Sequence, residues 1–209
     1  MASFRQKKGV WYFRYTDEHG RQRERKGSTS KRIARDMATE AEALANRIRQ
    51  GLLDPADVAA RKEAGRPLYE HMEDWHCSMI NRELGKAHAK LTRYRANAVA
   101  AIIAGADVAE LHHRRLSAPQ RAAMLLAIAD RLRTVTAGIL TRDAIQSALS
   151  KIRKAGASAQ TANHYRSAIR AFCRWMVESG RMRSNPVAGV KPYRADSDRR
   201  YERRALEPA

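Results

Sequence analysis

Aromatic and β-branched residues are interspersed with polar ones at the start of the chain, which is typical of short strands. Residues 10–15 read Val-Trp-Tyr-Phe-Arg-Tyr, a composition that strands favour. Gly20 then stands where a left-handed backbone would close a hairpin loop, and residues 21–27 follow it. A tighter turn at Lys7-Lys8-Gly9 follows a first short strand over residues 3–6. The pattern predicts three antiparallel strands.

From residue 30 the apolar spacing changes to three and four, which indicates an amphipathic helix that ends near Gly51. Ser30 is its candidate N-cap. A three-stranded sheet needs a second layer in water, so we expect this helix to cover it and to complete a β-β-β-α unit over residues 1–52. The helix residues expected to face the sheet are Ile33, Met37, Ala41, Leu44 and Ile48.

Residues 53–66 mix proline, glycine and charge, and we expect a linker there with at most one short helical turn. The pattern is helical from there to about residue 180, within a domain over residues 67–190, with helices expected over 68–84, 86–104, 117 to the 130s, 141–154 and 158–179. Gly85, Gly156 and Gly180 would end three of them. The fold class expected is α+β and mostly α, a small three-stranded antiparallel sheet with one helix followed by a four- to five-helix bundle.

Helix caps support these boundaries. Ser117, Pro119 and Gln120 form a capping-box signature, and Thr141 and Ser158 stand at two further helix starts. The apolar residues expected to face inward in the first four helices are Leu68, Met72, Trp75, Met79, Leu91, Tyr94, Ala98, Ile102, Met124, Leu125, Ile128, Leu132, Ile145 and Leu149.

The charge balance indicates a negatively charged partner. The chain has 41 Lys and Arg against 22 Asp and Glu, a formal net charge of +19. The excess extends along the whole chain, which suits a long, negatively charged partner such as nucleic acid. The alternative is a generally basic protein whose arginines are only solvated.

Other classes receive little support from the sequence. Cys77 and Cys173 have no neighbouring cysteine or histidine at zinc-ligand spacing, so we expect no metal and two buried thiols in a reducing compartment. No apolar run approaches the roughly 20 residues of a membrane span, and the N-terminus lacks a signal core. We expect a soluble, cytoplasmic bacterial protein associated with the nucleoid, without a cofactor.

The helix over residues 158–179 carries two stripes. One is apolar (Ala162, Tyr165, Ile169, Phe172 and Met176), and the other holds Asn163, Arg166, Arg170 and Arg174. Guanidinium groups bind phosphate or guanine and Asn pairs with adenine, so the polar stripe is a candidate DNA contact. Gln160, Thr161 and His164 lie near the start of the helix, where they could meet phosphate or a base.

The helix over residues 86–104 repeats the pattern, with Lys86, Lys90, Arg93 and Asn97 on one face. Two helices with cationic edges can grip a duplex together. A solvated polar face is the alternative for each helix.

In the sheet, we expect Trp11, Phe13 and Tyr15 to pack on the helix. Tyr12, Arg14 and the Lys7-Lys8 turn would then face outward, where a narrow sheet can enter a major groove. Arg21, Arg23 and Arg25 share one face of the third strand and complete the candidate DNA-binding set.

Two groups imitate catalytic motifs and are rejected. The run His112-His113-Arg114-Arg115 matches a His-x-x-Arg pattern but stands in a predicted loop, and Tyr193 and Tyr201 stand in a charged tail. We assign no catalytic or metal-binding residue. A nuclease that uses the His112 loop stays open as a third hypothesis.

These motifs resemble the DNA-binding domains of tyrosine recombinases of the phage-integrase type. Gly-Val-Trp-Tyr-Phe-Arg-Tyr at 9–15 and Ser-Lys-Arg-Ile-Ala at 30–34 resemble the arm-binding domain, which binds arm-type DNA sites. Thr-Arg-Asp-Ala-Ile at 141–145, the run from Ser158 to Trp175, Gly180 and Asn-Pro-Val at 185–187 resemble the core-binding domain, which clamps the crossover site. Residues 105–140 are longer than that pattern.

The resemblance implies a chain that binds double-stranded DNA site-specifically and self-associates on it within the full-length enzyme. Residues 191–209 resemble the basic linker to the catalytic domain, and none of that domain's Arg, Lys, His-x-x-Arg and Tyr motifs is assigned in this sequence. This chain would therefore bind DNA without cutting it. A stand-alone regulator or architectural protein derived from a truncated integrase is the alternative.

Overall fold

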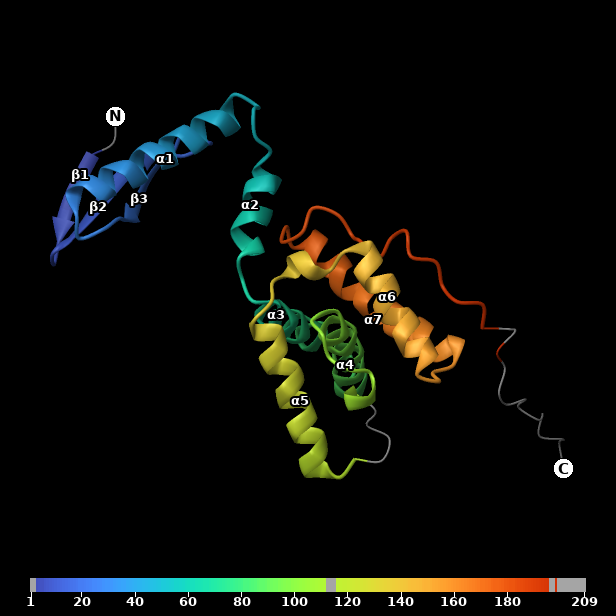
Figure 1. The fold of residues 1–209 in the computed structure, drawn as a ribbon. Coiled ribbons are helices and arrows are strands. Elements are labelled where there is room, and N and C mark those ends of the chain that lie inside the picture. Colours follow the sequence, from blue (N-terminus) through green and yellow to red (C-terminus); the bar gives the residue numbers. More distant parts are fainter. Residues whose placement is uncertain (1–2, 112–115, 196–197, 199–209) are drawn as a thin grey trace, which may run out of the picture. The chain divides into compact units, whose positions relative to one another are not determined.

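The structure is a computed structural model that describes residues 3–111, 116–195 and 198 (Figure 1). The chain forms two compact units, Met1–Ala59 and Ala60–Ala209. We call them the N-terminal unit and the helical unit. The fold is α+β and mostly helical, with a three-stranded antiparallel sheet followed by helices, as the sequence pattern predicts.

The sheet of the N-terminal unit has the order β1-β2-β3, with β1 (Ser3–Lys7), β2 (Val10–Thr16) and β3 (Gln22–Lys26). Lys8 and Gly9 form the first turn with φ angles of 48° and 77°, and Gly20 takes φ 79° in the second. The α1 helix (Lys31–Arg49) covers one face and buries Phe13 of β2. The predicted strands, turns and covering helix are confirmed.

The face of α1 that meets the sheet is predicted correctly at Ala41 and differs from the prediction at Ile33 and Leu44. The buried residues are Ala34, Ala38, Ala41 and Ala45, whereas Ile33 and Leu44 keep 46% and 38% of their surface exposed. Short side chains are required because the backbones approach closely. A Cβ on Gly27 would lie 2.9 Å from the Trp11 carbonyl oxygen and 3.0 Å from the Ala34 Cβ.

The segment expected as a linker contains the helix α2 (Pro55–Ala64), and the division between the two units falls inside it. The Asp54 carboxylate accepts a hydrogen bond from the Ala56 N–H at 2.9 Å. A local cap and alanine-rich composition therefore give ten helical residues where the proline and charges suggested one turn.

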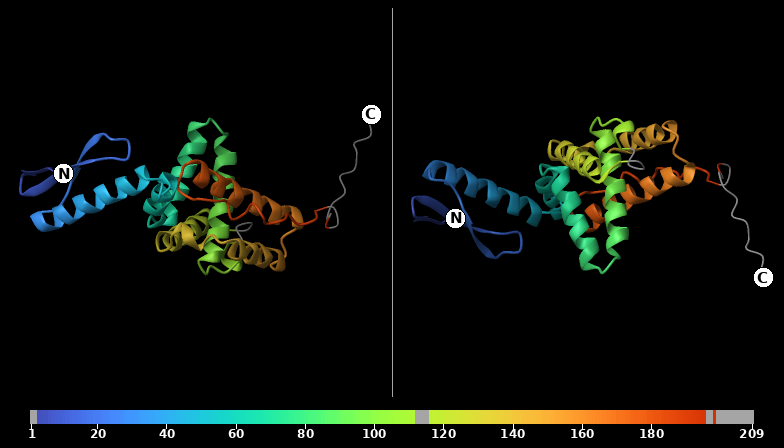
Figure 2. Two further views of the ribbon diagram at one scale, coloured as in Figure 1. Left: turned by 90° about the horizontal axis from the view of Figure 1, so that it is seen from above. Right: turned by 90° about the horizontal axis from the view of Figure 1, so that it is seen from below.

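The helical unit consists of α3 (Leu68–Asn81), α4 (Lys86–Ile103), α5 (Ala118–Arg133), α6 (Arg142–Lys154) and α7 (Ala159–Glu178), with short 3-10 turns at Ala109–Leu111 and Ala137–Ile139. Helix α4 contacts the other four (Figures 1 and 2). Every residue from Ala96 to Ile102 is buried. One apolar core joins all five helices, so the described residues of the range 105–140, with α5 among them, belong to the bundle.

Most of the predicted inward residues of this unit are buried, three (Tyr94, Met124 and Tyr165) are half-buried, and two are exposed. Leu91 and Leu125 keep 42% and 39% of their surface exposed. Only the C-terminal half of α4 is enclosed by its neighbours, and α5 fully buries only Ile128 and Leu132. Helix α3 ends at Asn81 rather than Leu84, because Glu83 adopts a left-handed conformation with φ 58°.

The predicted caps hold three helix starts. The Ser117 N–H donates to Gln120 Oε1 at 2.9 Å, the Thr141 hydroxyl accepts from the Ala144 N–H at 3.2 Å, and the Ser158 hydroxyl accepts from the Thr161 N–H at 3.1 Å. Each satisfies polar groups that the first turn of a helix leaves unpaired.

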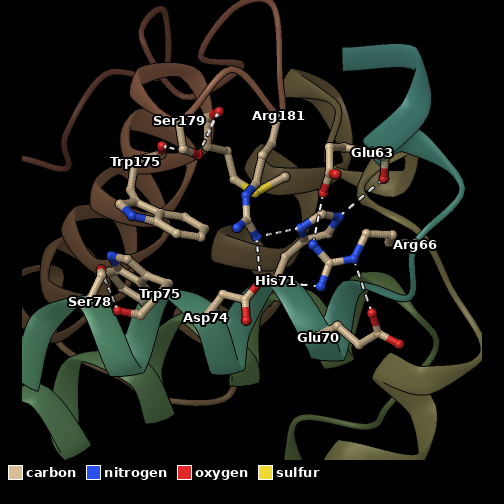
Figure 3. Close-up of polar contacts among 11 residues, drawn as sticks. Glu63, Arg66, Glu70, His71, Asp74, Trp75, Ser78, Trp175, Ser179 and Arg181 are labelled. Carbon is tan, nitrogen blue, oxygen red and sulfur yellow. Dashed lines mark hydrogen bonds and ion pairs between the residues drawn. The ribbon is translucent and has the colours of Figure 1, made fainter. Parts of the chain in front are cut away.

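A charged network joins the residues before α3 to the residues after α7 (Figure 3). Arg66 pairs with Glu63, Glu70 and Asp74, and Asp74 also accepts from Arg181 Nη1 at 2.6 Å. His71, which is fully buried, lies 3.2 Å from the same Nη1 through Nδ1 and 3.2 Å from the Glu63 carbonyl through Nε2.

A guanidinium can only donate, so the His71 Nδ1 accepts and its Nε2 carries the proton. Burial lowers the pKa of His71, which favours this neutral form. The Arg181 guanidinium also lies over the Trp175 ring, 4.6 Å from its centroid. The network thus fixes both ends of the helical unit around one uncharged imidazole.

Candidate nucleic-acid interface

The outer face of the sheet, turned away from α1, is cationic. In the strand register Arg5 pairs with Tyr12, Ser3 with Arg14, and Lys26 with Tyr12 on its other side. Because paired residues share a face, the side chains on the outer face include Arg5, Lys7, Tyr12, Arg14, Glu24 and Lys26. We call these six residues the outer sheet face; Lys8 is exposed at the adjoining turn.

Four cations share this face with its single carboxylate, and two of them pair with it. Glu24 accepts from Lys7 Nζ at 3.0 Å and from Arg14 Nε at 3.1 Å, and these partners lower its pKa. Lys7 Nζ also lies 5.1 Å from the centroid of the Tyr12 ring. Exposed ion pairs contribute little to stability, so a phosphate can replace Glu24 as the partner at small cost.

Arg21, Arg23 and Arg25 are not part of the outer sheet face. Arg25 pairs with Phe13 and Arg23 with Tyr15, so both side chains lie on the face that carries α1. Arg23 Nε donates to the buried Asp17 carboxylate at 2.9 Å, which lowers the pKa of Asp17 and raises that of Arg23. Arg21 precedes β3, and its N–H donates to the Asp17 Oδ1 at 2.8 Å.

The sequence set for the sheet therefore divides in two. Lys7, Tyr12 and Arg14 lie together on the outer sheet face. Sequence analysis missed Arg5 and Lys26, although the two turns contain the signal. Pairing outward from the Lys8-Gly9 turn and from the Gly20 loop places both residues beside Tyr12.

On α7 the predicted polar stripe is also divided. Gln160, His164, Arg170 and Arg174 are exposed, and Arg174 forms an i,i+4 ion pair with Glu178 at 3.0 Å. Thr161 is half-buried, with its hydroxyl 2.9 Å from that of Ser158. The exposed members are available to a partner, whereas Thr161 belongs to the start of the helix.

Asn163 and Arg166 are engaged by the segment that follows α7. The Asn163 amide donates to the Tyr193 carbonyl at 2.9 Å and accepts the Tyr193 N–H at 2.8 Å, and Arg166 Nε donates to the Val190 carbonyl at 2.6 Å. Burial, with neighbouring Arg170, lowers the pKa of Arg166. These two half-buried residues hold the segment that follows α7.

The same segment has further anchors. Val187 and Val190 are buried, and the Asp198 carboxylate accepts from Arg153 Nη1 and from the Ala159 N–H, each at 2.7 Å. The beginning of the expected basic linker thus packs on α6 and α7. Helical periodicity cannot reveal this, because the partners are 24 to 45 residues apart in sequence.

On α4 the predicted cationic face is exposed at the start of the helix and becomes buried toward its C-terminal end. Lys86 and Lys90 are exposed, but Arg93 pairs with Glu73 and lies 3.1 Å from the His76 Nδ1. Asn97 is buried, so it cannot reach a duplex. The cause is the central position of α4, whose C-terminal half is enclosed by its neighbours.

The rejected catalytic residues are only partly described. Tyr193 is half-buried, with its ring 5.8 Å from the Arg153 guanidinium and its hydroxyl 3.4 Å from that of Ser150. The run from His112 to Arg115 and Tyr201 lie outside the described residues. Over residues 3–111, 116–195 and 198, no three His, Cys, Asp or Glu side chains cluster as a metal site.

No helix in the described part of the chain is long and apolar enough to cross a membrane. Comparison of the chain with protein-family models, curated protein sequences and solved structures finds no significant match.

Proposed function

We propose that this chain binds double-stranded DNA site-specifically as the N-terminal part of a tyrosine recombinase. The observation that carries the proposal is the outer sheet face, where Arg5, Lys7, Arg14 and Lys26 lie around one carboxylate on an exposed sheet. Lysine and arginine contacts to phosphate supply most of the affinity of such proteins, and a narrow sheet fits the major groove. Tyr12, at the centre of the face, would lie against the bases.

The exposed cations of the helical unit support a second contact surface. Arg170 and Arg174 on α7 and Lys86 and Lys90 on α4 are exposed, and α4 and α7 pack against each other. Gln160 and His164 extend the exposed polar face of α7 toward its N-terminus, which favours anions. In this proposal the sheet binds arm-type sites and the helices bind the crossover site.

The recombinase class rests on the sequence resemblance. The motifs at residues 9–15, 141–145 and 158–175 follow the arm-binding and core-binding patterns. Strand cleavage and rejoining would be the work of the family's catalytic domain. In the cell the chain would associate with the nucleoid and assemble with further copies on its site.

A salt titration of DNA binding by the full chain tests the proposal. Fluorescence anisotropy with a labelled duplex is expected to show an affinity that falls steeply with salt, by about one power of concentration for each phosphate contact. A single strand of the same sequence should bind more weakly. Absence of duplex binding at low ionic strength would refute the proposal.

The α7 surface is tested by Arg170→Ala with Arg174→Ala. The matched control is Lys151→Ala with Lys154→Ala, which removes the same charge from exposed positions on α6. The α7 pair should weaken binding by about tenfold or more and the control pair much less. Equal losses of affinity in the two pairs would show that the α7 arginines contribute only through net charge.

A further inference from the structure

Helix α1 carries an apolar stripe that the N-terminal unit does not cover. Ile33 and Leu44 are 46% and 38% exposed, and Met37 and Ile48 are half-buried. At about 100° per residue this stripe lies roughly 80° around the helix from the alanines that face the sheet. The α1 helix therefore has two apolar sides, one on the sheet and one at its flank.

The stripe is symmetric along the helix. Ile33 and Ile48 are equally far from the midpoint between Glu40 and Ala41, and so are Met37 and Leu44. An antiparallel second copy of α1 would place Ile33 against Ile48 of the other copy and Met37 against Leu44. The overlap would extend over 16 residues, roughly 24 Å of helix. A two-fold interface requires such a self-complementary surface.

The charges beside the stripe fit the same pairing. Asp36 and Arg47 are exposed on the flank away from the sheet. In the antiparallel pair each Asp36 comes within reach of Arg47 of the second copy, and the symmetry makes this contact twice. Glu40 is the exception, because it lies near the midpoint and close to its own counterpart.

The N-terminal unit also has a reason to bury more apolar surface. Its described core centres on Phe13, Ala38 and Ala41, with Phe4, Tyr15 and Met37 packed around them. A domain of fewer than 60 residues buries a smaller fraction of its surface than a larger domain does and is only marginally stable alone. Covering the stripe would remove two exposed large side chains per copy from water.

We propose that α1 binds α1 of a second copy of this chain, side by side and antiparallel. A single helix face is smaller than the roughly 800 Å² per partner of a standard interface, so the association is weak and depends on concentration. The two-fold axis is perpendicular to the plane of the two helices, so both sheets lie on the same side of that plane. If the proposed function also holds, the two outer sheet faces address an inverted pair of DNA sites.

Disulfide trapping without DNA tests this pairing independently of DNA binding. Cys173 is buried as expected, but Cys77 is exposed and must be removed first. In a Cys77→Ser background, Glu40→Cys should cross-link to its own counterpart, and Asn46→Cys, on the opposite side of α1, should not. Ile33→Cys and Ile48→Cys should cross-link to each other when the two proteins are mixed, and each alone should stay largely monomeric. Circular dichroism establishes that each variant is folded.

Sedimentation equilibrium supplies the second readout. Leu44→Glu should weaken dimerisation by about tenfold or more, whereas Leu52→Glu, at a 69% exposed leucine beyond the helix, should leave it unchanged. Glu40→Ala should strengthen the dimer by removing the like-charge contact. Monomers at all concentrations would overturn the pairing, and so would cross-linking by Asn46→Cys equal to that by Glu40→Cys. A stripe that binds only the helical unit or another protein would also overturn it.

Discussion

The two units use their polar residues differently. In the N-terminal unit Lys7 and Arg14 of the outer sheet face pair with Glu24 on the same face, and Lys7 also lies near the Tyr12 ring. In the helical unit Asn163, Arg166 and Arg181 bind backbone or side-chain groups that come from distant parts of the chain. Charge alone therefore does not identify a binding surface, because some arginines and amides hold the fold together.

The hydrophobic cores of the two units also differ in the size of their side chains. The helical unit packs five helices around large side chains, with the Phe172 and Trp75 rings 5.3 Å apart, whereas the N-terminal unit packs alanines against Phe13. In the helical unit, some polar residues bind groups from distant parts of the chain and so stabilise the bundle. The smaller core of the N-terminal unit leaves the cations of the outer sheet face at the surface, although Asp17 is buried and accepts from Arg23 Nε.

The largest expected losses of stability come from truncating one phenylalanine in each of the two cores. Phe13→Ala should cost about 3–5 kcal/mol, enough to unfold the N-terminal unit and leave the helical unit intact. Phe172→Ala should cost the helical unit a similar amount and leave the sheet protected. Hydrogen exchange measured by mass spectrometry on the full chain would show which peptides lose protection. Simultaneous loss in both units would contradict their independence.

The next effect separates structural from exposed residues on α7. Asn163→Ala should destabilise the helical unit by about 2 kcal/mol, because two hydrogen bonds to the Tyr193 backbone are lost at roughly 1 kcal/mol each. Arg170→Ala, at an exposed position, should leave urea unfolding nearly unchanged and weaken DNA binding instead. A larger loss of stability in Arg170→Ala than in Asn163→Ala would show that Asn163 does not hold the segment that follows α7.

The charged network gives the helical unit a pH dependence. Burial lowers the pKa of His71, so below the ordinary value of about 6.5 the unfolded chain binds a proton that the folded chain resists. Stability should be complete above that pH and fall as the pH drops toward the lower folded pKa. His76 acts in the same direction.

The acids of the network act in a lower range. The pKa values of Asp74 and Glu63 are also lowered, so their contribution disappears only below about pH 4.5. Urea midpoints between pH 7.5 and 5.5 should therefore decrease, and His71→Gln should reduce the decrease. If the urea midpoint of that variant decreases with pH as much as that of the unmodified chain, His71 does not cause the pH dependence.

The smallest effect lies on the outer sheet face. Glu24→Gln should change the thermal midpoint little, because its partners Lys7 and Arg14 are exposed. It should raise duplex affinity several-fold at low salt, since the only carboxylate of that face is removed. Glu42→Gln on α1 makes the same charge change elsewhere and is the control. Equal gains would indicate a general charge effect.

Sequence patterns predicted the elements well where the signal is local. The strands, the turns at Gly9 and Gly20, and the caps at Ser117, Thr141 and Ser158 all depend on neighbouring residues. The side of α1 that meets the sheet could not be predicted from hydrophobicity, because close backbone approach at Gly27 selects alanine over isoleucine or leucine.

The candidate site was predictable only in part for a related reason. Periodicity identified Arg170 and Arg174 but could not reveal that residues 190–193 return to cover Arg166 and Asn163. It also grouped Asn97 with Lys86, although the enclosure of α4 depends on helices that follow it in sequence. Arg23 and Arg25 required the strand register.

The salt dependence of duplex binding for two matched double variants tests whether the outer sheet face contacts DNA. Arg5→Ala with Lys26→Ala removes two cations from the outer sheet face, and Arg25→Ala with Arg35→Ala removes two exposed cations of the same unit away from it. The outer pair should weaken binding strongly and lower the salt slope by about two, whereas the other pair should change the slope little. Equal slopes for the two variants would contradict a DNA contact at the outer sheet face.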